Sequence, residues 1–158
     1  MGAKRRVVRE KVLQTLYAFE LSHEPLDFVI SQILSELKED SETFAFAEAL
    51  VRKTVAFQED IDAMIKQRVA NWEFNRIAMM DRLILRMCIC ELLHFEDIPP
   101  KVSINEAIEI ARRFSTEKSD KFVNGVLDSV LDDLKATGAL KKTGRGLVDQ
   151  SFRKGKPE

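Results

Sequence analysis

PPKVSINEAIEIARRFSTEKSDKFVNGVLD, residues 99–128, predicts two amphipathic helices joined by a short polar break. Pro99 and Pro100 stop any helix that runs in from upstream, because proline disfavours helix both at and before its own position. Ser103 precedes Glu106 by three residues, which is the spacing of a capping box at a helix start. The apolar residues that follow at helical spacing give this helix one buried face: Ile104, Ala107, Ile108, Ala111 and Phe114.

The second helix follows residues 115–119 and also has one apolar face. Its members are Val123, Val126, Leu127, Val130, Leu131 and Leu134. At 100° per residue, Phe122 lies well off that face, beside Lys118, Lys121 and Gly125. An exposed ring among cations is a platform on which an unpaired nucleic-acid base can stack. Packing of Phe122 against a neighbouring element is an equally open alternative, since scattered apolar surface is normal.

Two runs in this stretch resemble the signature of the NusB family of bacterial transcription antitermination factors. They are KVSINEA at residues 101–107 and KFVNGVLD at residues 121–128. The resemblance covers about residues 4–134, and it implies two small helical bundles packed into one domain, with the split near residue 75. The same module also occurs fused to RNA methyltransferases. This chain has no methyltransferase portion, so we expect the free-standing factor.

Composition limits the function classes. The 158 residues are 45% hydrophobic and 32% charged, which suits one compact domain with its own core. The formal net charge is −1, so nucleic-acid binding would depend on local charge asymmetry. No apolar run is long enough to span a membrane and no signal-type segment follows the basic start, so we expect a cytoplasmic protein. Cys88 and Cys90 cannot pair on one helix, and no metal, cofactor or catalytic constellation is evident.

The N-terminal segment is basic. Lys4, Arg5, Arg6, Arg9 and Lys11 stand against Glu10 alone. Tyr17 falls on the same flank of the predicted helix as Arg6, and guanidinium groups grip phosphates while a Tyr ring can stack on a base. A solvated basic terminus is the commoner interpretation of such a charge run. The family resemblance implies that this arginine-rich start, with the Leu16-Tyr17 pair, contacts RNA.

The remaining sequence predicts an all-α fold of about seven helices. They cover about residues 4–21, 25–38, 43–55, 59–70, 77–95, 103–114 and 119–134. Trp72, in a break at residues 71–75, is expected to plug the core. The helix at residues 77–95 should be buried nearly all round, so Arg86 and Glu91 need structural partners. The resemblance implies that Asp81 contacts a protein partner.

We expect a helical RNA-binding domain over residues 1–137 and a basic, disordered tail over residues 138–158. The resemblance implies a non-enzymatic factor that binds single-stranded boxA-type RNA of nascent ribosomal RNA transcripts, together with NusE, in the RNA polymerase antitermination complex. We expect the stripes of the first and last helices to share one RNA-binding face. Residues expected to bind RNA are Lys4, Arg5, Arg6, Arg9, Tyr17, Lys118, Lys121, Phe122 and Gly125. The alternative is a protein-interaction scaffold or homodimer without selective RNA binding.

Overall fold

A computed structural model describes residues 2–147 of the chain. Within that range the chain forms eight α-helices and two short 3-10 helices, and no strand, which confirms the all-α prediction. The sequence predicted seven of these helices. The additional one is α5, Asn71–Arg76, which lies where the sequence predicted only a break. Contacts divide the chain between Gln58 and Glu59, so the predicted split near residue 75 was wrong.

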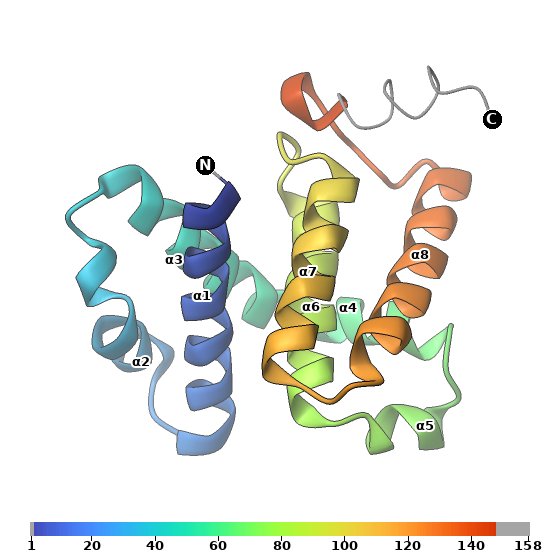
Figure 1. Cartoon of the computed structure of the whole chain (residues 1–158), viewed down its shortest axis with the longest axis horizontal. Coiled ribbons are helices and arrows are strands. Elements are labelled where there is room, and N and C mark those ends of the chain that lie inside the picture. Colours follow the sequence, from blue (N-terminus) through green and yellow to red (C-terminus); the bar gives the residue numbers. More distant parts are fainter. Residues whose placement is uncertain (1, 148–158) are drawn as a thin grey trace. The chain divides into compact units, whose positions relative to one another are not determined.

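The N-terminal unit, residues 2–58, is built on α1, Gly2–Ser22. Figure 1 shows α1 against α2, Leu26–Ile33, and α3, Ser41–Ala56, and both pairs are in contact. The predicted second helix is shorter than expected, because the chain tightens after Leu34 into the 3-10 helix η1, Ser35–Leu37. The core of this unit comes from the inward faces of these helices: Val8, Val12, Leu16, Val29, Ile30, Leu34, Ala47, Leu50 and Val51.

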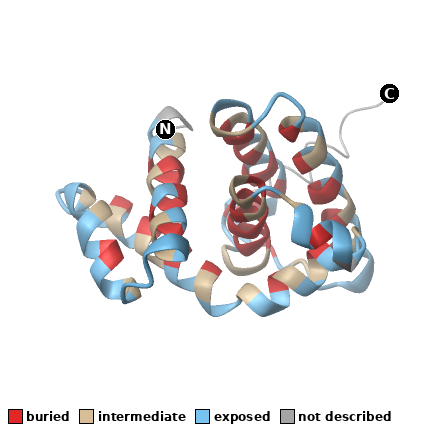
Figure 2. Cartoon of the chain, turned by 90° about the horizontal axis from the view of Figure 1, so that it is seen from below, coloured by how far each residue is buried: buried red, intermediate tan, exposed pale blue. Residues whose placement is uncertain are grey.

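The C-terminal unit, residues 59–147 of the described chain, is organised around α6, Met79–His94. This helix packs against α7, Pro100–Phe114, and α8, Ser119–Thr137, which also pack against each other. α4, Gln58–Lys66, and α5 precede them (Figure 1). Every residue from Leu83 to Leu92 is buried, which confirms the prediction that α6 is surrounded. Figure 2 shows buried residues on the inward sides of the helices and exposed residues outside.

Two charged residues buried in α6 have partners in the same unit. Arg86 donates to both carboxylate oxygens of Asp62 on α4, at 2.7 and 2.9 Å. Glu91 accepts a hydrogen bond of 2.7 Å from the Ser103 hydroxyl on α7. The predicted capping box was therefore wrong, because α7 begins at Pro100 and the Ser103 side chain points to α6. The expected structural partners of Arg86 and Glu91 are confirmed.

The segment after α8 continues the fold. Gly138 ends α8 in the left-handed conformation that glycine adopts easily, with φ 75°. The buried Lys142 ammonium donates to the Glu91 and Phe95 carbonyls at 3.1 and 2.7 Å. η2, Gly144–Leu147, follows, and a Cβ at Gly146 would overlap the Glu96 carbonyl. The prediction of a disordered tail from residue 138 was therefore wrong up to Leu147, and residues 148–158 lie outside the described range.

Among the described residues, no helix is both long enough and apolar enough to cross a membrane.

Candidate nucleic-acid interface

The start of α8 is fixed by hydrogen bonds from hydroxyl groups to Asp81. The Ser115 hydroxyl donates to one Asp81 oxygen at 2.6 Å, and the Ser119 hydroxyl donates to the other at 2.9 Å. Asp81 is only 8% exposed. Both oxygens join α6 to the α7–α8 connection, and the contact of Asp81 with a protein partner stays a prediction. This hydrogen-bond network sets where the first turn of α8 begins.

The outer face of that turn carries four predicted RNA-binding residues, which we call the α8 surface: Lys118, Lys121, Phe122 and Gly125. Both lysines and the glycine are exposed, and Phe122 is half-buried. Val123, Val126 and Leu127 face the core, as the helical spacing predicted. The structure therefore brings these four residues together on the side of α8 away from its apolar face.

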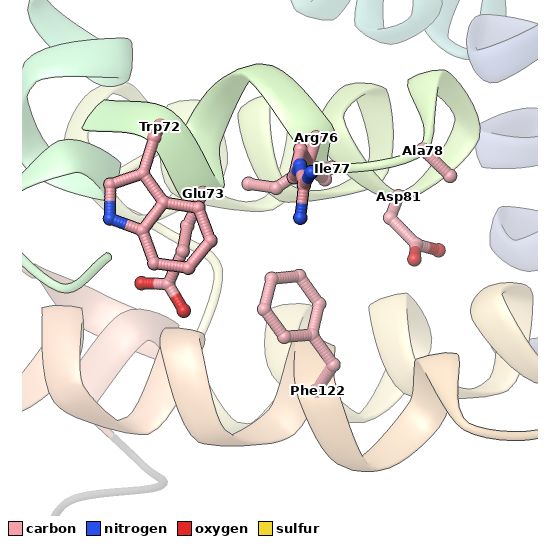
Figure 3. Close-up of a pocket in the computed structure, with 7 residues that line it drawn as sticks. All are labelled: Trp72, Glu73, Arg76, Ile77, Ala78, Asp81 and Phe122. Atoms are coloured by element: carbon pink, nitrogen blue, oxygen red, sulfur yellow. The ribbon is translucent and has the colours of Figure 1, made fainter. Parts of the chain in front are cut away.

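Phe122 lines a cavity of about 350 Å³ within the C-terminal unit. The other lining residues come from α5 and the start of α6: Trp72, Glu73, Arg76, Ile77, Ala78 and Asp81. Figure 3 shows these side chains and Phe122 converging from opposite sides. Trp72 is 62% exposed, so its prediction as a core plug was wrong. Phe74 is the buried aromatic of α5 instead, with Lys66 and Arg82 placed over its ring.

The N-terminal unit carries a second candidate surface on α1, which we call the α1 surface: Lys4, Arg5, Arg6 and Tyr17. Lys4 pairs with Asp40 at 2.8 Å, and the Arg5 guanidinium lies 3.9 Å from the centre of the Phe46 ring on α3. Tyr17 is 39% exposed, which leaves much of its side chain open to solvent. α3 thus holds the basic end of α1 in place.

Arg9 does not belong to that surface. Its side chain is 3% exposed, and its guanidinium lies 5.6 Å from the Phe46 ring centre. The structure therefore does not bring Arg9 together with the exposed cations of α1, and RNA binding by Arg9 stays a prediction. Helical spacing could have predicted the burial of Arg9, because Arg9 falls one turn before Leu13, which is also buried, and one turn after Arg5.

Ion pairs tune the charges near both surfaces. Hydrogen bonding by Lys4 and by the Thr43 N–H lowers the pKa of Asp40 from 3.8 to about 2. Near the α8 surface, a hydrogen bond from Arg112 lowers the pKa of Asp120. Both carboxylates therefore stay ionised and neutralise nearby cations. Among residues 2–147, no three His, Cys, Asp or Glu side chains gather as a metal site would require.

Comparisons with known proteins agree with the helical arrangement. A family model described as the NusB family matches residues 6–132. The transcription antitermination protein NusB of Chloroherpeton thalassium is 45% identical over 98% of this chain and 74% of that protein. The protein of the same name from Salinibacter ruber is 48% identical over 92% of both chains. The one from Bacillus subtilis is 41% identical over 84% of this chain and 98% of its own.

Solved structures give the same result. T. maritima NusB matches with a TM-score of 0.76 and 38% identity, covering 82% of this chain and 91% of that chain. A crystal structure of the antitermination factors NusB and NusE in complex with dsRNA matches with a TM-score of 0.75. At 24% identity, over 84% of this chain and 99% of that one, this second likeness concerns the fold. The chain therefore belongs to the NusB family.

Proposed function

We propose that this protein is an RNA-binding transcription antitermination factor without enzymatic activity. It binds single-stranded boxA-type RNA of nascent ribosomal RNA transcripts in the cytoplasm, together with NusE, and joins the RNA polymerase antitermination complex. Support comes from family membership, with 45–48% identity to two proteins named for transcription antitermination. It also comes from two surfaces whose chemistry suits RNA.

The α8 surface is the observation that carries the proposal. Two exposed lysines, Lys118 and Lys121, lie on one side of Phe122, so a base could stack on its ring while the lysines meet neighbouring phosphates. Gly125 adds to this argument, because no atom beyond its chain neighbours and the adjacent backbone of its own helix lies within 4 Å of where its Cβ would be. A mid-helix glycine costs stability, and packing within the fold does not require this one. A strand lying close against the helix backbone would require it.

The α1 surface supplies phosphate contacts and a second ring. Arg5 is held in position on Phe46, so little side-chain freedom remains to be lost when it binds a phosphate. Lys4 is exposed, and surface ion pairs such as Lys4–Asp40 are weak, so the ammonium can exchange its carboxylate for a phosphate. Tyr17 offers its exposed ring to a base.

Fluorescence anisotropy of a labelled boxA-type RNA, with and without NusE and at low and high salt, tests the proposal. Selective binding that NusE strengthens and salt weakens is expected, because cations on the protein replace counterions on the RNA. A duplex of the same sequence serves as a control for strand state, since the related complex contains dsRNA. Equal binding of scrambled RNA, or a self-association that is insensitive to salt, would instead favour the interaction scaffold.

The Phe122→Ala variant tests the residue that carries the argument. Loss of one stacked base costs about 1–3 kcal/mol of binding free energy. Replacing Arg5 and Arg6 by Ala should weaken binding to all RNAs alike and flatten the salt dependence. A folded Phe122→Ala protein with unchanged RNA affinity would assign Phe122 to packing.

A further inference from the structure

Trp72 has an exposure that the fold does not explain. A tryptophan is usually well buried, yet this side chain is 62% exposed while Phe74, two residues later, fills the core. The Arg76 guanidinium lies 5.7 Å from the centre of the Trp72 ring. Exposed Trp and Arg side chains are enriched where proteins bind partners or ligands. The position of Trp72 beside a cavity therefore suggests a ligand.

The cavity beside Trp72 is an open depression whose size and aromatic lining suit one planar ring system. Its volume of about 350 Å³ is at the small end of ligand pockets, and it is too small to hold a helix of a protein partner. Trp72 from α5 and Phe122 from α8 both line the cavity, and each adds an aromatic ring from a different helix (Figure 3). Two aromatic rings on separate elements suit a flat ligand better than an extended peptide.

Polar groups at the rim match the remaining parts of a nucleotide. Arg76 is exposed beside the indole, where its guanidinium could hold a phosphate. Glu73 accepts one hydrogen bond, from the Ala70 N–H at 3.0 Å. A carboxylate has further acceptor sites, which suit an amino or imino N–H on a base edge. Carboxylates in the lining disfavour a free phosphate inside the slot, so the base enters and the phosphate stays at the rim.

We propose that Trp72 and Phe122 form a slot that takes up one unpaired nucleobase of the bound RNA, with Arg76 holding its phosphate. This inference rests on the proposed function and extends the RNA-binding surface from α8 to α5. Phe122 then contributes both to the α8 surface and to the slot, because the base in the slot contacts its ring from the α5 side. Trp72 and Arg76 then become RNA-binding residues that helical periodicity did not reveal.

The chain offers a direct reporter, since Trp72 is its single tryptophan. Titration with the single-stranded boxA-type RNA should quench tryptophan emission, because a stacked base is in contact with the indole. Quenching should saturate at the same RNA concentration as the anisotropy signal. Wild-type binding by anisotropy with unchanged emission would overturn the slot while leaving the proposed function intact. Absence of any selective RNA binding would overturn the function itself.

Variants then test the energetics. Trp72→Ala should weaken RNA binding on the order of 5- to 150-fold, the usual loss for one stacked base, and Trp72→Phe should recover part of it. Phe28→Ala is the matched control, because this α2 ring is 48% exposed and belongs to neither surface. It should leave RNA affinity unchanged. Circular dichroism checks that each variant keeps its helices.

Abasic RNAs identify the base in the slot. Removing the bases one at a time should reveal one position whose loss weakens wild-type binding but costs Trp72→Ala nothing more, because the two changes remove the same contact. Additive losses at every position would overturn the inference. So would a Trp72→Ala protein that binds RNA normally but has lost NusE, which would assign the cavity to the protein partner.

Discussion

Gly125 shows how one residue can separate folding from function. It lies inside α8, is exposed, and has open space where a side chain would begin. Gly125→Ala should stabilise the protein by about 0.5–1 kcal/mol, because alanine restricts the unfolded chain and favours helix. The same methyl group should weaken RNA binding by holding the strand off the backbone. Chemical denaturation and fluorescence anisotropy measure the two effects on one protein.

Ala136→Gly, also exposed and on α8, is the matched control for that experiment. It makes the reverse exchange near the far end of the helix. It should lower stability and leave RNA affinity unchanged. If Gly125→Ala stabilises the protein and binds RNA as well as wild type, the open side of α8 does not approach the strand.

Asp40 gives a pH test of how the α1 surface is anchored. Its pKa is lowered from 3.8 to about 2, so the folded state favours the ionised carboxylate more than the unfolded state does. Its contribution to stability is therefore present above about pH 4 and is lost as the pH falls through about 2. Asn also caps helices, so Asp40→Asn keeps the cap of α3 and removes the charge that pairs with Lys4.

Denaturant unfolding at several pH values measures this contribution. Wild type should be more stable than Asp40→Asn at pH 6, and the difference should close towards pH 2. RNA affinity at neutral pH should not fall, since Lys4 is released towards phosphate. A stability difference that stays constant with pH would mean that the Lys4 pair contributes nothing to folding.

At the residue scale, the sequence predicted what one helical wheel can reveal. Phe122 stands off its apolar face because six well-spaced residues define that face. Trp72 was misplaced because α5 has six residues, too few for a reliable period, and either Trp72 or Phe74 could have been the buried ring. The burial of Arg9 was not expected because charge was weighed above position, although a long side chain can pack its stem on a ring such as Phe46.

Lys142 links the segment after α8 to the end of α6. Its ammonium donates to the carbonyl of Glu91 in the last turn of α6 and to that of the C-cap residue Phe95, where the helix dipole favours a cation. Lys142→Met should lower stability by about 1–2 kcal/mol at neutral pH, because two hydrogen bonds are lost while the apolar stem is retained. Urea unfolding of wild type and of Lys142→Met measures this loss in the free energy of unfolding.

Lys142 should also make the stability of the protein depend on pH in the alkaline range. Burial lowers the pKa of Lys142 below its usual 10.5, so the folded state releases this proton before the unfolded state does. Between the two pKa values the unfolded state binds more protons, and this group's contribution to stability rises with pH. The difference between wild type and Lys142→Met should therefore change on approach to pH 10.5. A difference that is flat with pH would show that the ammonium is solvated.

At the element scale, periodicity gave the long helices and failed where tertiary contacts decide. α6, α7 and α8 were predicted close to their true extents, since each carries a sustained apolar pattern. Ser103 has capping-box spacing, but Pro100 starts α7 earlier and Glu91 takes the hydroxyl. The basic composition after Gly138 suggested disorder, and only the fold reveals that Lys142 finds carbonyl partners.

At the scale of the whole molecule, each unit carries one candidate surface. The α1 surface belongs to residues 2–58 and the α8 surface to residues 59–147. Neither surface alone is strongly basic, and the net charge of the chain is −1, so affinity should depend on one RNA engaging both. Binding of two linked sites gains from effective concentration only when the strand is long enough to reach both.

Shortening the RNA from either end tests this arrangement. A full-length boxA-type strand should be sensitive both to Phe122→Ala and to replacement of Arg5 and Arg6 by Ala, with nearly additive losses, because the two sets lie in different units. Removal of nucleotides from one end should abolish sensitivity to one set, and removal from the other end should abolish sensitivity to the other. Each truncation should also flatten the salt dependence, since fewer phosphates are contacted. If both sensitivities disappear together at one RNA length, the two surfaces do not bind separate parts of one strand. The cations of α1 would then affect binding at the α8 surface only through the long-range electrostatic potential of the protein.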